Sequence, residues 1–133
     1  MIKIKRVCKP GETNANGVTY DLDSYNEALK RFGERIKYGI SSELFMCKGY
    51  RYMDELKRQS FYFVNPENCC GKIVEVTDEY IVIEPNSTDR AATLVQLIND
   101  GVELSAFMRY IGDANKTPAK VINIITFDIM MKE

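Results

Sequence analysis

The sequence predicts an α+β fold with a mainly antiparallel, barrel-like core of about seven strands flanked by two helices. Three observations lead to this prediction. Short segments rich in β-branched and aromatic residues recur at close spacing, and two longer segments repeat apolar residues with the 3.6-residue period of a helix. The length of 133 residues suits one domain, which we place at residues 1–133.

The first third of the chain predicts a strand, a short extended segment and a helix. Residues 2–8 (IKIKRVC) alternate apolar and basic side chains, which is typical of a strand with one face in water. A turn precedes the extended residues 18–20. Residues 22–38 carry apolar residues at helical spacing, with Asp23 or Ser24 as the expected N-cap.

The middle of the chain predicts mostly strands. Residues 43–52 fit either a strand or irregular structure, and residues 61–64 (FYFV) read as a strand that ends before a proline. Residues 72–76 and 79–84 are rich in β-branched residues and only two residues separate them. We therefore expect these two strands to form a hairpin.

Residues 87–100 predict the clearest helix in the chain. Asn86 or Ser87 is the expected N-cap, and Gly101 is suited to stop the helix because glycine tolerates a left-handed backbone. The side chains expected to face the core are Ala91, Leu94, Val95 and Ile98.

Two extended segments follow this helix. In residues 102–111, positions 107 and 109 should face one side of the sheet, and positions 108 and 110 the other side. Residues 121–129 (VINIITFDI) are too apolar for the edge of a sheet, so we expect a buried strand there.

The composition excludes several classes of function. The chain has no histidine, so Ser-His-Asp and Cys-His catalytic systems and histidine-containing zinc sites are ruled out within one chain. The formal net charge is -1, which makes nucleic-acid binding an unfavoured expectation.

The cysteines and the N-terminus indicate a protein of a reducing compartment. Cys8, Cys47, Cys69 and Cys70 lack the paired spacing of a zinc site, so no metal is expected, and we expect reduced thiols. The first residues lack the apolar segment of a signal peptide, so we expect none there, and no apolar run is long enough to predict a membrane span.

Four stretches of the chain resemble the signatures of one protein family. They are residues 14–21 (NANGVTYD), residues 54–59 with 64–73 (DELKRQ and VNPENCCGKI), residues 101–110 (GVELSAFMRY) and residues 127–130 (FDIM). In this order and spacing they are similar to the prohead maturation proteases of tailed bacteriophages, relatives of the herpesvirus assembly protease. The resemblance spans nearly the whole chain.

The resemblance implies a protease fold without protease chemistry. The two catalytic histidines of the family fall on Arg58 and Gly71, and its serine pair falls on Phe107 and Met108. None of these four side chains can act as nucleophile or general base in that mechanism. Arg109 matches the family, in the region that would help to hold an oxyanion. We therefore expect no enzymatic activity and no cofactor.

The sequence contains other residues that could act as a nucleophile. Cys69 or Cys70 could use Lys72 as a base, and Ser105 could pair with Lys57. Nothing in the sequence places any of these pairs at hydrogen-bond distance, and the favoured reading makes Ser105 an ordinary strand residue.

The two arginines at matched positions allow two readings. Arg58 and Arg109 together could bind an anion or a partner, since guanidinium groups match carboxylates and phosphates. The favoured reading is an ordinary salt bridge with Glu55 or Glu103.

The resulting hypothesis is a catalytically inactive structural or assembly protein of a phage, found in the host cytoplasm or the virion. Its expected partners are itself and a capsid or scaffold protein. The alternative is a small phage accessory protein that inhibits a host factor or sequesters an anionic ligand. We expect at least a dimer, with an interface formed by Phe107, Met108, Met130 and Met131.

Overall fold

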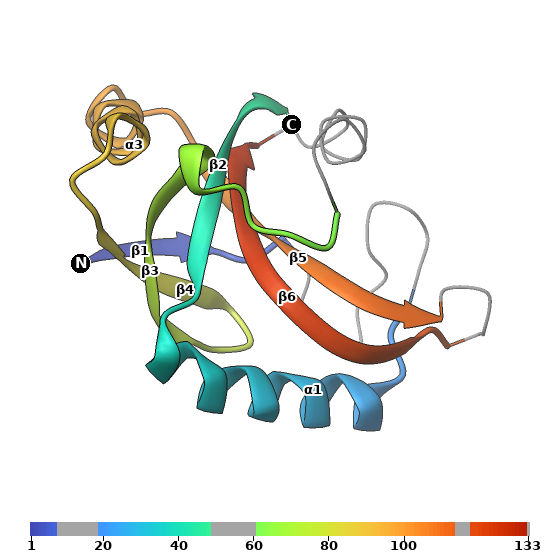
Figure 1. Ribbon diagram of the computed structural model, residues 1–133. Helices are drawn as coiled ribbons and strands as arrows, with labels where there is room; N and C mark the ends of the chain where they lie inside the picture. Colours follow the sequence, from blue (N-terminus) through green and yellow to red (C-terminus); the bar gives the residue numbers. More distant parts are fainter. Residues whose placement is uncertain (8–18, 49–60, 114–117, 133) are drawn as a thin grey trace.

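The computed structural model describes residues 1–7, 19–48, 61–113 and 118–132 (Figure 1). Its elements, in chain order, are β1 (Ile2–Lys5), α1 (Leu22–Arg35), η1 (Ile36–Tyr38), β2 (Ser41–Lys48), η3 (Pro66–Asn68), β3 (Cys69–Val76), β4 (Tyr80–Pro85), α3 (Asp89–Asn99), β5 (Leu104–Asp113) and β6 (Lys120–Met131). No helix within these ranges is both long enough and apolar enough to cross a membrane.

The described strands form one six-stranded mixed sheet in the order β1-β4-β3-β2-β6-β5. All pairs are antiparallel except β2 with β6. The edge strands β1 and β5 approach each other at a single bridge between Arg6 and Ala106, and the sheet is not closed. The α+β class with two helices is therefore confirmed, whereas the barrel-like closure and the count of seven strands are not.

Residues 61–64 and 18–20, which were expected to be extended, do not form strands of the sheet within the described residues. Residues 61–64 form a turn and bend, and β2 fills the central place in the sheet. Aromatic content indicated a strand at residues 61–64, but Tyr62 and Phe63 are exposed there rather than packed. Of residues 18–20, Tyr20 makes one isolated bridge with Ala119, and residue 18 lies outside the described ranges.

The central strands follow the local patterns closely. The hairpin of β3 and β4 forms as predicted around Thr77 and Asp78, with Ile73 opposite Ile83. Strand β6 lies between β2 and β5, which confirms that this apolar segment is not an edge. Apolar side chains on both of its faces are buried, because other layers cover it on both sides.

The N-cap of helix α1 lies two residues before Asp23, the first of the two expected caps. Asp21 is the N-cap, and its carboxylate accepts a hydrogen bond from the Ser24 backbone N–H at 3.0 Å. This bond lowers the pKa of the Asp21 carboxyl. The helix buries Tyr25, Ala28 and Phe32 against the sheet.

Helix α3 is capped by Thr88, not by Asn86 or Ser87, and Gly101 follows it with a left-handed φ of 78°. Its buried face holds Ala91 and Leu94. The prediction that Val95 and Ile98 also face the core is wrong, because each is 40% exposed. These two side chains face a groove rather than the sheet.

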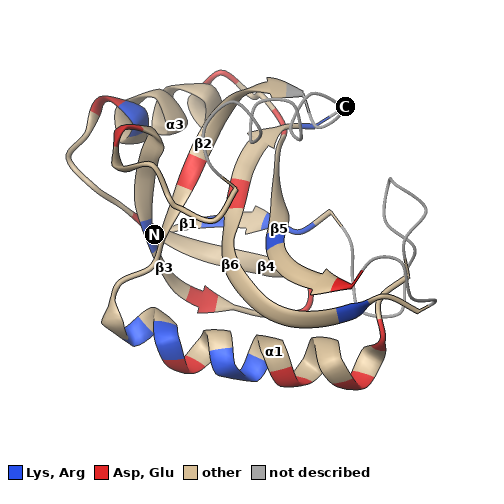
Figure 2. Cartoon of the chain, turned by 45° about the vertical axis from the view of Figure 1, so that its right-hand side comes forward, with Lys and Arg blue, Asp and Glu red and all other residues tan. Residues whose placement is uncertain are grey.

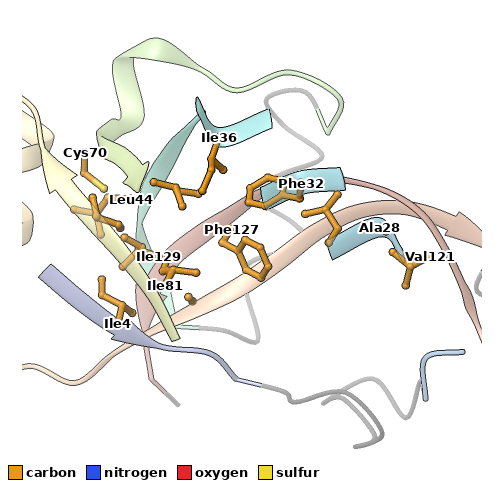
Figure 3. Close-up of a cluster of buried hydrophobic side chains, with 14 of the residues drawn as sticks. Ile4, Ala28, Phe32, Ile36, Leu44, Cys70, Ile81, Val121, Phe127 and Ile129 are labelled. Atoms are coloured by element: carbon orange, nitrogen blue, oxygen red, sulfur yellow. The ribbon is translucent and has the colours of Figure 1, made fainter. Parts of the chain in front are cut away.

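One core cluster contains side chains from both helices and from the strands of the sheet. Phe32 of α1 meets Phe127 of β6 edge to face, with ring centroids 5.4 Å apart. Leu94 of α3 belongs to the same cluster. Figure 3 shows side chains from α1 and from several strands pointing toward one another in this cluster. A separate, smaller cluster contains Phe45 and Met130.

Candidate functional site

The segment that matches the catalytic strand of the resembled family is β5. Its two faces divide as predicted: Met108 and Tyr110 pack against the main core, whereas Phe107 packs against the smaller cluster. Arg109 lies on the same face as Phe107 and is 1% exposed. A fully buried guanidinium requires buried acceptors, because desolvating an unpaired charge is costly.

Two carboxylates and a short loop surround the Arg109 guanidinium. Its Nε and Nη2 donate to the two carboxylate oxygens of Asp128, at 2.9 and 2.8 Å. Nη2 also donates to Glu43 at 2.6 Å. Nη1 donates to the carbonyl oxygen of Phe63 at 3.0 Å and to that of Phe61 at 3.5 Å. We call Glu43, Arg109 and Asp128 the buried charge cluster.

Two further polar side chains extend the buried charge cluster. The side-chain amide of Asn68 donates to Glu43 at 3.2 Å. Arg90 of α3 donates to the Asn68 side-chain oxygen at 3.2 Å and to the Leu44 carbonyl at 3.4 Å. The helix is thereby tied to the cluster through a chain of hydrogen bonds.

The path of β2 explains why the two carboxylates meet. Up to Glu43 this strand pairs with β3, and from Leu44 it pairs with β6, opposite Ile129. The register of β2 with β3 shifts between Ser42 and Glu43, just before this change of partner. Glu43 therefore lies beside Asp128, the residue before Ile129. Figure 2 shows acidic positions side by side in β2 and β6.

The geometry of the buried charge cluster leaves no donor of Arg109 for an outside anion. A guanidinium has five N–H donors, and five hydrogen bonds to protein acceptors engage them. Arg109 forms ion pairs with Glu43 and Asp128. Glu103, one of its two predicted partners, pairs with Lys132 at 3.3 Å. Glu55 and Arg58 lie outside the described residues, so a pairing with Glu55 and an anion site that includes Arg58 stay predictions.

Gly71, the match to a catalytic histidine of the family, is required by close packing. A Cβ built at this position would lie 2.6 Å from the Glu84 carbonyl oxygen and too close to the Ile83 side chain. Strand β4 would have to move to admit any side chain there. Glycine at this position is therefore a condition of the hairpin.

The four residues predicted as an interface form no exposed patch. Met130 is fully buried with Phe45, and Phe107 packs against that pair. Met108 packs against the main core, and Met131 is half-buried. The cause is that both faces of β6 are buried near its end, so Met130 fills the smaller cluster with Phe45. Self-association stays a prediction, without this surface to support it.

The cysteines beside the cluster are poor nucleophiles. Burial raises the pKa of the Cys69 thiol to about 11, and the nearby Glu43 and Asp128 carboxylates add to this effect. Burial raises the pKa of Cys70 to about 12. Lys72 is exposed while both cysteines are buried, so nothing in this arrangement supports the Cys-Lys pair.

We expect slow alkylation of Cys69 and Cys70 in the folded protein. A pKa two units above the ordinary 9.0 lowers the thiolate fraction of Cys69 about a hundredfold at pH 8, since only the thiolate reacts. Iodoacetamide labelling of folded and urea-unfolded protein, read by peptide mass spectrometry, measures the ratio. Equal rates would contradict the burial.

The same pKa values imply a pH dependence of stability. Because the folded pKa values lie above 9.0, the contribution of these protonated thiols to the free energy of unfolding is fully present below pH 9. It is lost as the pH rises toward 11 and 12.

A groove lies next to the matched strand. It has a volume of about 1090 Å³ and runs between β1, α3 and the first residues of β5. Ser105 and Phe107 line it, together with the exposed Val95 and Ile98. The proposed partner of Ser105, Lys57, lies outside the described residues. The groove is the surface feature that the sequence analysis missed.

The sequence analysis also missed Glu43 and Asp128. A signal for each was present, because a single acidic residue interrupts an apolar segment in SSELFM and in IITFDIMM. A charged side chain in a buried strand is strongly destabilising unless an opposite charge is buried beside it. An acidic residue within an apolar strand therefore predicts a buried basic partner. Arg109, in the apolar strand after α3, met the same criterion.

Among the described residues, no group of three or more cysteine and acidic side chains is arranged to hold a metal ion. Comparisons of the chain with protein-family models, with curated proteins and with solved structures found no match.

Proposed function

We propose that this protein is a non-catalytic relative of the phage prohead proteases that acts in particle assembly by binding a capsid or scaffold chain. The observation that carries the proposal is the buried charge cluster. Arg109, which matches the oxyanion region of the family, uses its guanidinium entirely inside the protein. A residue held in this way supports the fold and leaves no charge for a reacting group.

The other matched positions support the same proposal. Gly71 stands where a side chain would collide with β4, and Phe107 and Met108 contribute to two apolar clusters. The three matched catalytic positions within the described residues, Gly71, Phe107 and Met108, therefore serve packing in this chain, and the fourth, Arg58, lies outside them. A protein of this kind would act by binding a capsid or scaffold chain, and the groove beside β5 is a surface where that chain could bind.

Purified protein is expected to show no serine-hydrolase reactivity. A fluorophosphonate probe should leave it unlabelled, because Ser105 has no histidine in the chain to activate it. The protein should leave capsid and scaffold chains of its source intact while co-purifying with one of them. A known serine hydrolase provides the positive control.

The possible outcomes separate the parts of the proposal. Specific cleavage of a capsid or scaffold chain, or labelling at Ser105, would contradict the non-catalytic assignment. Capture of a host protein, with no capsid or scaffold chain bound, would contradict the assembly role and favour inhibition of a host factor.

A further inference from the structure

The groove joins the two open edges of the sheet. Strands β1 and β5 are the outermost strands, and residues of both line the groove. The edges meet where the Val7 backbone N–H donates to the Ala106 carbonyl at 3.1 Å, beside the isolated bridge between Arg6 and Ala106. Before that point, no β-ladder joins the two strands.

On the β1 side, the backbone of Lys3 points away from β4. The Arg6 N–H donates to the Glu79 carbonyl in β1–β4 pairing, so alternate residues, including Ile4, face β4. Odd-numbered residues of this segment direct their backbone groups to the other side, away from β4. Lys3 is one of them, and Val7 is another, since its N–H donates to Ala106 of β5. Within the described residues, the Lys3 N–H and C=O have no strand partner.

On the β5 side, the backbone N–H and C=O of Leu104 likewise point away from the neighbouring strand, β6. The Lys132 N–H donates to the Glu103 carbonyl at 3.0 Å, so Glu103 faces β6 and Leu104 faces away from it. The Leu104 N–H and C=O are therefore directed toward the β1 side. Open donors and acceptors of this kind are what an added strand pairs with.

The walls of the groove are apolar. Val95 and Ile98 of α3 are each 40% exposed, and both face the groove. Val102, Leu104 and Phe107 complete this side. The volume of about 1090 Å³ slightly exceeds the roughly 300–1,000 Å³ of small-molecule sites, so it can hold several residues of a polypeptide.

The charged side chains of the groove are mainly basic. Among the described lining residues, Lys3, Lys5 and Lys132 are basic and Glu103 is acidic. Glu103 pairs with Lys132 at 3.3 Å, so Lys3 and Lys5 supply the excess of positive charge, in a molecule whose formal net charge is -1. Arg6 lies on the inner side, where its guanidinium stacks over the Phe127 ring at 4.7 Å. This local excess of positive charge selects an acidic occupant.

We propose that the groove binds an extended, acidic polypeptide segment with alternating apolar residues, which adds a strand at the open edge of β1. Its backbone pairs with Lys3 and Leu104, its apolar side chains contact Val95 and Ile98, and its carboxylates meet the lysines. A second copy of β1 fits poorly, because antiparallel pairing of two IKIK edges sets lysines opposite lysines. The inference rests on the groove alone and stands whether or not the chain acts in particle assembly.

Binding of a defined peptide tests the proposal. The probe is a fluorescein-labelled octapeptide of alternating Asp and Val, and the control is the same peptide with Lys in place of Asp. Fluorescence anisotropy should detect saturable binding of the acidic peptide, weaker at 500 mM salt than at 50 mM, because the lysine contacts are screened. A peptide with proline at its central Val should bind about tenfold more weakly, because proline donates no backbone hydrogen bond.

Variants locate the site. Val95→Glu with Ile98→Glu should weaken binding about tenfold or more, as should Lys3→Glu with Lys5→Glu. All four side chains are exposed, so these changes should preserve the fold, which circular dichroism checks. Leu22→Glu alters another exposed apolar residue, on α1, and should leave binding unchanged. No binding of the acidic peptide at 1 mM, or equal binding by all variants, overturns the proposal.

Amide hydrogen exchange tests the strand addition itself. The Lys3 and Leu104 amides should exchange quickly in the free protein and at least about tenfold more slowly with saturating peptide. Binding that leaves both amides unprotected overturns the added strand. Protection that appears without peptide and grows with protein concentration also overturns the proposal, because a second copy then occupies the groove.

Discussion

Replacing Arg109 with methionine is expected to lower the free energy of unfolding by about 3–5 kcal/mol. The change leaves two buried carboxylates, of Glu43 and Asp128, without the guanidinium that both contact within 3 Å. It also frees the carbonyl oxygens of Phe61 and Phe63. Urea unfolding followed by circular dichroism measures the loss.

The control for this prediction is an exposed ion pair. Arg31 contacts Glu27 at 3.6 Å on the surface of α1, and Arg31→Met should cost at most about 0.5 kcal/mol. Adding Glu43→Gln and Asp128→Asn to Arg109→Met should recover part of the loss, because the buried charges are then removed. A loss below about 1 kcal/mol for Arg109→Met would contradict the burial of the cluster.

Truncating Leu94 to alanine is expected to cost about 2–5 kcal/mol of unfolding free energy. Leu94 is fully buried where α3 meets the main core, so the change removes apolar contacts and leaves a cavity. The midpoint of urea unfolding should fall while the slope of the transition is kept.

Val95→Ala is the matched control on the same helix. Its side chain is 40% exposed in the groove, so its truncation should cost no more than about 0.5 kcal/mol. Similar losses for the two variants would mean that α3 is rotated relative to the core. This comparison distinguishes the observed packing from the four-residue face predicted by periodicity.

The non-catalytic assignment and the peptide-binding inference depend on different parts of the molecule. The non-catalytic assignment follows from the buried charge cluster and from the packing of Gly71. The peptide-binding inference follows from the open edges of β1 and β5 and from the basic groove. An active hydrolase would refute the first and leave the second standing, and a groove that binds no acidic segment would do the reverse.

Local patterns in the sequence determined most of the elements. Alternation predicted β1, continuous apolar character placed β6 inside the sheet, and the two-residue spacing predicted the β3–β4 hairpin. Helix positions followed from the 3.6-residue period, with errors at the N-caps. These features depend on neighbours within one or two turns of chain, which the sequence displays directly.

Tertiary structure decided the site. The partners of Arg109 lie 66 and 19 residues away in the sequence, and they meet because β2 leaves β3 and joins β6 in parallel. The helical period placed Leu94 and Val95 on one face, but the packing of α3 against β3 buries Leu94 and leaves Val95 facing the groove. The sequence likewise suggested that Met130 was an extra apolar residue at the surface, whereas the structure buries it with Phe45 in the smaller cluster. Burial and ion pairing depend on contacts between distant segments, and no local pattern specifies those contacts.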